Sequence, residues 1–204
     1  MYTQDITGGL AKTSKMPCPS YNLPATACKV GSRLRQIKNS VCSDCYACKH
    51  RYRFKRTQST LHRRLEALNH PEWVIQMAKN INKTGTKYFR WHDSGDIQDE
   101  NHLKNIFAVC RLTPDVKHWL PTLEIKTVLQ VLQTTEKPPN LTIRVSTHLV
   151  DKVPNSYKFP RSMVYTKIPA ANVFLCHATI NHTSCKECRA CWNENIKIIG
   201  YKKH

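Results

Sequence analysis

Two cysteine runs are the residues in this sequence best suited to chemistry. The first is Cys42-Ser-Asp-Cys45-Tyr-Ala-Cys48, and the second is Cys185-Lys-Glu-Cys188-Arg-Ala-Cys191. Two residues between neighbouring thiols allow a tight turn to direct both sulfurs at one metal centre. Clustered cysteines in a chain that shows no secretion signal are more typical of metal binding than of disulfides. We therefore expect this protein to bind metal through thiolates.

Each run supplies three thiols, whereas tetrahedral zinc or a cubane iron–sulfur cluster takes four ligands. Cys176 lies shortly before the second run and can complete it. Either Cys28 or Cys18 can complete the first run, which leaves one of the two over. Cys110 lies on the apolar face of an expected helix, so we interpret it as a buried core residue.

The spacing of the runs favours iron–sulfur over zinc. Triple Cys-x2-Cys-x2-Cys runs resemble ferredoxin spacing, whereas paired cysteines predominate in zinc fingers. Basic residues beside the runs would also offset the negative charge of a cluster. We predict a 4Fe–4S cluster, with zinc as the alternative. The Cys-x3-Cys-x2-Cys signature of radical-SAM enzymes is absent as such.

Alternating strand and helix patterns fill the middle of the chain. Strands are predicted at 86–91, 117–121, 141–146, 163–166 and 173–176, and helices at 101–111, 125–132 and after residue 58. Three prolines indicate irregular backbone in residues 1–28. Strands separated by helices imply parallel pairing, because parallel strands need a crossover. The sequence therefore predicts an α/β fold with a parallel sheet.

A His-Asp-Ser-Gly-Asp segment at 92–96 directly follows the first of these strands. In a parallel sheet, functional groups collect at the carboxyl ends of the strands. We expect Asp93, Ser94, Gly95 and Asp96 to bind a cofactor or substrate, since the glycine allows close backbone approach. The alternative is a turn whose aspartates cap the next helix.

The composition is strongly basic, with 32 Lys and Arg against 14 Asp and Glu and a formal net charge of +18. Nucleic acid is the obvious polyanionic partner, and a solvated basic surface is the alternative. Tyr46, Tyr52 and Phe54 are interleaved with the basic residues and could stack on bases. The predicted nucleic-acid contacts are Arg33, Arg35, Lys38, Arg51, Arg53, Lys55 and Arg56. No stretch is long and apolar enough for a membrane span, so we expect a cytoplasmic protein without membrane contact.

Several motifs together resemble the phage "gene product eighty-eight" domain family. They are KTSKMPCPSYNLPA (12–25), the first Cys-x2-Cys with its Tyr-Ala, FRWHDSGD (89–96), WLPT (119–122) and the terminal cysteine run with its tryptophan. The family is found mainly in bacteriophages and is distantly similar to radical-SAM-like partial (β/α) barrels. The resemblance implies a host-cell cytoplasmic location and a SAM-type amine at HDSGD. The family pattern does not require Cys48, which raises Cys28 as a ligand.

We therefore predict a single domain over 1–204. It is a partial (β/α) barrel, radical-SAM-like, with irregular Cys-rich terminal segments: a basic cluster-binding segment at 1–58, a βα core at 59–176 and a Cys-rich segment at 177–204. The predicted metal ligands are Cys28, Cys42, Cys45, Cys48, Cys176, Cys185, Cys188 and Cys191. The leading hypothesis is an iron–sulfur enzyme, radical-SAM-like and able to bind S-adenosylmethionine, that acts on or near nucleic acid. The alternatives are a non-enzymatic nucleic-acid-binding protein with structural Zn or Fe–S centres, and an electron-transfer protein.

Overall fold

Short strands and helices alternate along much of the chain. The computed structural model describes residues 5–153, 158–169 and 172–203. The strands are β1 (Ala11–Lys12), β2 (Pro19–Tyr21), β3 (Tyr88–Trp91), β4 (Lys117–Thr122), β5 (Leu141–Ser146), β6 (Arg161–Tyr165), β7 (Phe174–Leu175) and β8 (Ile198–Lys202). The α-helices are α1 (Lys29–Leu34), α2 (Lys55–Ala67), α3 (Trp73–Lys83), α4 (Glu100–Leu112), α5 (Ile125–Val131) and α6 (His177–Ile180). Four short 3₁₀ helices are η1 (Ala25–Ala27), η2 (Tyr46–Cys48), η3 (His50–Arg53) and η4 (Ala190–Trp192).

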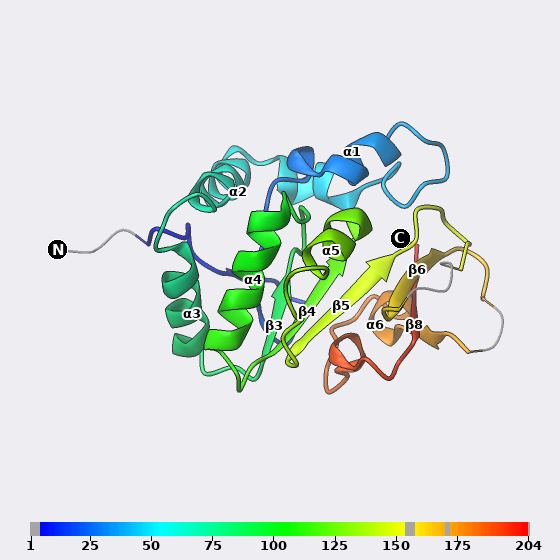
Figure 1. Ribbon diagram of the computed structural model, residues 1–204. Helices are drawn as coiled ribbons and strands as arrows, with labels where there is room; N and C mark the ends of the chain where they lie inside the picture. Colours follow the sequence, from blue (N-terminus) through cyan, green and yellow to red (C-terminus); the bar gives the residue numbers. More distant parts are fainter. Residues whose placement is uncertain (1–4, 154–157, 170–171, 204) are drawn as a thin grey trace.

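The strands of the described residues form one eight-stranded sheet in the order β1-β2-β3-β4-β5-β6-β8-β7 (Figure 1). Only β1 and β2 pair antiparallel, and the other neighbouring strands are parallel. Helix α4 connects β3 to β4 and α5 connects β4 to β5, as parallel crossovers require. The prediction of a mixed α/β fold built on a mostly parallel sheet is confirmed.

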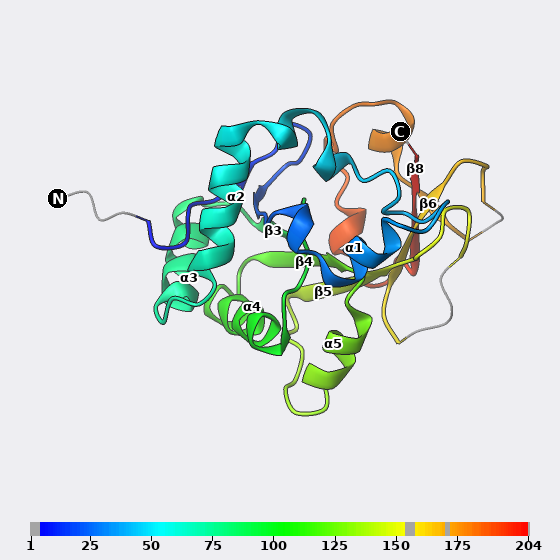
Figure 2. The same ribbon diagram turned by 90° about the horizontal axis from the view of Figure 1, so that it is seen from above.

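The central strands are covered on both faces. Figure 2 shows α4 and α5 on one side of β3, β4 and β5, with the orange C-terminal segment on the other. The main core lies beneath the helices and includes Phe89, Trp91, Leu120 and Ile143. On the opposite face Trp119 packs with Trp192 of η4 and with Cys18. Because side chains alternate along a strand, neighbouring residues of β3 and β4 serve these two cores.

The carboxyl ends of the central strands face α1 and the loop after it. The arrowheads of β4 and β5 point toward this part of the chain in Figure 1. The backbone N–H of Val30 in α1 donates to Glu124 Oε1, just after β4, at 2.7 Å. The bridge between Ser40 and Leu149 joins the same loop to the residues after β5. The first cysteine run therefore lies at this edge of the sheet.

Most predicted elements are present with small shifts in their ends. The strands predicted at 86–91, 117–121 and 141–146 are β3, β4 and β5, and those at 163–166 and 173–176 are β6 and β7. The interpretation of residues 1–28 as irregular is wrong for β2, which pairs in parallel with β3. This strand is three residues long, too short to display an alternating pattern. The Cys-rich terminal segments also contain α1 and β8, so they are only partly irregular.

Candidate metal centres

Four thiols gather at the carboxyl ends of the strands, and we call them the first thiol group (Cys28, Cys42, Cys45 and Cys48). Cys28 directly precedes α1. A Cβ atom built on Gly31 would lie 3.6 Å from Cys42 Sγ and 3.7 Å from Cys28 Sγ, so both sulfurs flank this glycine. The backbone N–H of Cys48 donates to the Cys45 carbonyl at 3.1 Å, which forms the tight turn expected of the run.

The first thiol group is shielded from water and its members influence one another. Burial raises the pKa of Cys42 to about 12, and the Cys45 thiol and Asp96 carboxylate reinforce the shift. Burial, followed by Asp96 and the other thiols, also raises the pKa of Cys28. The Arg35 guanidinium acts in the opposite direction on both. Thiols with raised pKa values are poor nucleophiles at neutral pH, so this arrangement does not suit cysteine-based covalent catalysis.

Asp96 connects the first thiol group to the end of β4. Its carboxylate accepts hydrogen bonds from Thr122 Oγ1 at 2.6 Å, Leu123 N at 2.9 Å and Ile97 N at 2.8 Å. Burial raises the pKa of this carboxyl group to about 7, and the three hydrogen bonds oppose the rise. The carboxylate thus fixes the geometry of two strand ends beside the thiols.

The other three residues of the predicted cofactor-binding segment make structural contacts. The Asp93 carboxylate accepts from Arg90 Nη1 and from Tyr52 OH, both at 2.6 Å, and Tyr46 OH donates to the Asp93 carbonyl. Ser94 Oγ donates to the Leu23 carbonyl at 2.8 Å. Gly95 has a φ of +80°, and a Cβ there would lie 2.5 Å from Leu23 Cβ. Within HDSGD, Asp96 alone is a main electrostatic neighbour of the first group's thiols in the described residues.

Five further cysteines gather near the other face of the sheet, and we call them the second thiol group (Cys18, Cys176, Cys185, Cys188 and Cys191). Four of them, all except Cys18, line a cavity of about 330 Å³. The backbone N–H of Cys188 donates to the Cys185 carbonyl at 2.9 Å, the same turn as in the first run. The sequence left the partner of Cys18 open, and the structure brings Cys18 to this second group.

Burial and cations set the electrostatics of the second thiol group. Burial raises the pKa values of Cys18 and Cys191 to about 12 each. Arg90 counteracts the shift at both thiols, and Tyr201 OH lies 3.2 Å from Cys191 Sγ, in hydrogen-bonding distance. A group of thiols surrounded by guanidinium groups is suited to hold net negative charge once the thiols ionise.

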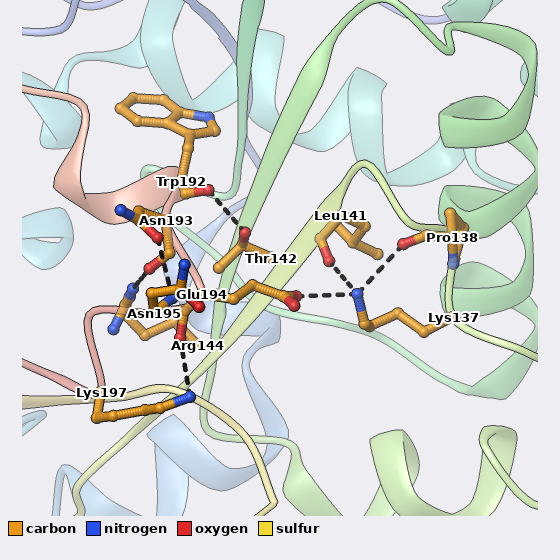
Figure 3. Close-up of polar contacts among 10 residues, drawn as sticks. All are labelled: Lys137, Pro138, Leu141, Thr142, Arg144, Trp192, Asn193, Glu194, Asn195 and Lys197. Atoms are coloured by element: carbon orange, nitrogen blue, oxygen red, sulfur yellow. Dashed lines mark hydrogen bonds and ion pairs between the residues drawn. The ribbon is translucent and has the colours of Figure 1, made fainter.

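Buried polar contacts fix the segment that carries Cys191 to the sheet (Figure 3). Arg144 on β5 is fully buried and donates to the carbonyls of Ile196 at 2.9 Å, Arg161 at 3.1 Å and Asn193 at 3.1 Å. Thr142 Oγ1 donates to the Trp192 carbonyl at 3.0 Å. In the same view Lys137 Nζ pairs with Glu194 Oε1 at 2.9 Å.

The Arg90–Asp93 ion pair connects the surroundings of the two groups. Arg90 stacks over Trp119, with its Cζ 4.7 Å from the ring centroid, and its charge acts on Cys18 and Cys185. Its partner Asp93 is held by Tyr46 and Tyr52, which adjoin the first run. Strand β3 therefore carries one charged pair that faces both thiol groups. The sequence gave no signal for this role, because Arg90 reads as an ordinary polar residue of a half-exposed strand.

The predicted nucleic-acid contacts are mostly exposed. Arg33, Lys38, Arg51, Arg53, Lys55 and Arg56 are all solvent-exposed, and none has an acidic partner within the described part of the chain. Phe54 is 62% exposed and Tyr46 51% exposed among them. Arg35 differs, because it donates to the Ala25 carbonyl at 2.9 Å beside the first thiol group. Six of the seven cations are thus free to meet a polyanion.

Neither thiol group is a preformed coordination shell. Within residues 5–153, 158–169 and 172–203, no three Cys, His, Asp or Glu side chains converge closely enough to form a ready-made metal site. All ten cysteines are free thiols. Cys110 is fully buried on α4 in the main core, which confirms its interpretation as a packing residue.

A family model described as Gene product 88 matches residues 3–194. The chain belongs to the Gene product 88 family. The match spans both cysteine runs and HDSGD, so it confirms the resemblance to a phage gene-product family. No curated protein and no solved structure matches this Gene product 88 protein. Every helix in its described residues is too short or too polar to cross a bilayer.

Proposed function

We propose that this protein is an iron–sulfur protein in which each thiol group ligates one cluster. The observation that carries the proposal is the sorting of nine cysteines into two groups from distant parts of the chain. Their thiols are free, and the pKa values of Cys18, Cys42 and Cys191 are raised to about 12. Buried neighbouring thiols are poor nucleophiles, and metal ligation is the chemistry that ionises them. A bound cluster would supply one-electron transfer.

The donor sets fit such clusters. Each group contains at least the four thiols that a 4Fe–4S cluster needs, and each contains a Cys-x2-Cys-x2-Cys run. Arg35 lies near the first group, and Arg90, Arg144 and Arg189 lie near the second. These cations would offset the negative charge of a cluster with four thiolates. Metal binding would draw the sulfurs of each group closer and release their protons to solvent.

Metal analysis of cysteine variants tests this proposal. Wild-type protein purified without oxygen should contain iron and acid-labile sulfide. Cys45→Ser should lose iron, because it removes a thiol of the first group, whereas Cys110→Ser should keep the wild-type content. Iron content that is unchanged in Cys45→Ser would contradict the assignment of the first group.

A radical-SAM-like activity is the enzymatic form of this proposal. The first thiol group follows β2, the glycine-containing HDSGD segment follows β3, and Asp96 lies beside Cys28 and Cys42. This order resembles a partial barrel in which a cluster loop precedes a glycine-containing strand end. The Asp96 carboxylate would bind the amine of S-adenosylmethionine.

Titration of the iron-loaded protein with S-adenosylmethionine tests the enzymatic form. Asp96→Asn should weaken binding at least tenfold, because it removes a charge worth about 1.4 kcal/mol or more to an ammonium group. Asp115→Asn is the matched control, since Asp115 is exposed and lies at the opposite end of β4. Equal affinity in the wild type and Asp96→Asn would refute the role of Asp96.

Contact with nucleic acid is a second proposed property, and the exposed cations favour it. Arg51, Arg53 and Arg56 lie in or next to η3, beside the exposed ring of Phe54. Cations of this kind bind phosphates, and exposed aromatic rings can stack on unpaired bases. Without the thiol groups as catalytic centres, the same surface would describe a non-enzymatic binding protein.

Salt-dependent binding to single- and double-stranded DNA tests this property. Changing Arg51, Arg53 and Arg56 together to Gln should lower the slope of log K against log salt by about 2 to 3, one unit for each phosphate contact. The control changes the exposed residues Lys79, Lys83 and Lys126 to Gln and removes the same charge elsewhere. Equal slopes for the two triple variants would show that the charge acts without a defined surface.

A further inference from the structure

The segment before β2 lies directly against the second cysteine run. The backbone N–H of Cys185 donates to the Lys15 carbonyl at 3.1 Å. Cys185 Sγ lies 3.9 Å from Met16 Sδ. Two residues further along, Cys18 is 4% exposed and packs with Trp119 and Trp192. Residues 170 positions apart in the chain are thus held together by backbone and side-chain contacts.

Four of the five thiols in the second group form a closed set of neighbours. The Cys18 thiol interacts with those of Cys185 and Cys191, and the Cys176 thiol interacts with the same two. Cys191 also packs against the apolar cluster that contains Cys18. Each of the four is therefore next to two others, as ligands around one cluster would be.

Cys188 differs from these four. It is the only exposed cysteine among the described residues, although it lies at the same cavity. Its thiol acts on Cys185 alone among the second group's itemised interactions, and there it is weaker than Cys176. The position between the other two cysteines of the run is thus turned toward solvent.

Positive charge and hydrogen-bond donors surround the closed set. Arg90 and Arg189 act on Cys18 and Cys185, and Arg144 acts on Cys191. Tyr201 OH adds a hydrogen bond at Cys191 Sγ. Hydrogen bonds and positive charge stabilise ligating thiolates.

We propose that Cys18, Cys176, Cys185 and Cys191 are the ligands of the second metal centre and that Cys188 lies outside it. The inference rests on the proposed function, because it assigns the ligands of a thiolate-bound centre. Each of the four thiols loses its proton to solvent on ligation, and the Cys188 thiol stays free.

Metal content of the anaerobically purified protein tests this assignment. Cys188→Ser should keep the wild-type content of iron and sulfide. Cys18→Ser and Cys176→Ser should each fall to about half, because one of two equal centres is lost. A full content in Cys18→Ser together with a loss in Cys188→Ser would overturn the assignment. Wild-type protein without metal would instead refute the proposed function itself.

Alkylation of the loaded wild-type protein gives a test that no folding defect can affect. Iodoacetamide treatment followed by mass spectrometry of peptides should modify Cys188 and leave Cys18 protected. After removal of the metal with a chelator and denaturation, both should react. Protection of Cys188 with modification of Cys18 in the loaded protein would overturn the assignment.

Discussion

Replacing Arg144 by methionine should detach the Cys191 segment from the sheet. Arg144 is fully buried and makes three hydrogen bonds of 3.1 Å or less to backbone carbonyls (Figure 3). A hydrogen bond from a charged donor contributes about 1.5 to 3 kcal/mol, so three give at least about 4.5 kcal/mol. Methionine regains part of this, because it no longer buries a charge. We expect the free energy of unfolding to fall by about 3 kcal/mol.

Urea unfolding followed by tryptophan fluorescence measures this loss. With a slope of about 2 kcal/mol per molar urea, the midpoint should fall by about 1.5 M. Arg63→Met is the control, because Arg63 is exposed on α2 and the same charge is removed. That variant should stay within about 0.5 kcal/mol of the wild type. A loss below about 1 kcal/mol in Arg144→Met would refute the anchoring role.

Three further predictions concern acid, backbone strain and a thiolate hydrogen bond. Burial lowers the pKa of His118 to about 3, whereas the pKa of an unfolded histidine is about 6.5. Its contribution to stability is therefore full above pH 6.5 and falls by about 1.4 kcal/mol per pH unit down to about pH 3. Urea unfolding of His118→Phe across this window should show a dependence on pH that is smaller by that amount, and an equal dependence would contradict it. Gly95→Ala should cost at least about 2 kcal/mol, because the new Cβ meets Leu23. Gly85→Ala, also at positive φ but with nothing within 4 Å, should cost about 1 kcal/mol. Equal losses in urea would show that the Leu23 contact is unimportant. In the iron-loaded protein, Tyr201→Phe should lower the reduction potential of one centre, because it removes the hydrogen bond to Cys191 Sγ. Two unchanged potentials in a redox titration would argue against Cys191 as a ligand.

The sequence predicts the central strands well because both of their faces are buried. The run at 141–146 is apolar and β-branched and becomes β5, buried along five of its six residues. The terminal strands are different. β2 and β8 are short or contain glycine and charges, and they form because a neighbouring parallel strand offers backbone partners. Such pairing is a tertiary effect that local pattern does not encode.

The cysteine runs were identifiable from spacing, but their partners were not. The place of Cys18 depends on β2 bringing residues 15–18 against the second run, and no local pattern predicts that contact. Arg144 lies in a strand that reads as continuous and apolar, so its buried charge is visible only when its carbonyl partners are in place. The role of Asp96 was half visible, because HDSGD predicted a site at a strand end.

The most direct test of the account is the count of metal and sulfide in the wild-type protein. Protein purified without oxygen should be brown and should bleach on reduction. It should contain about eight iron and eight sulfide atoms per chain if both thiol groups hold a 4Fe–4S cluster. A colourless protein with stoichiometric zinc, or one without bound metal, would contradict the iron–sulfur account.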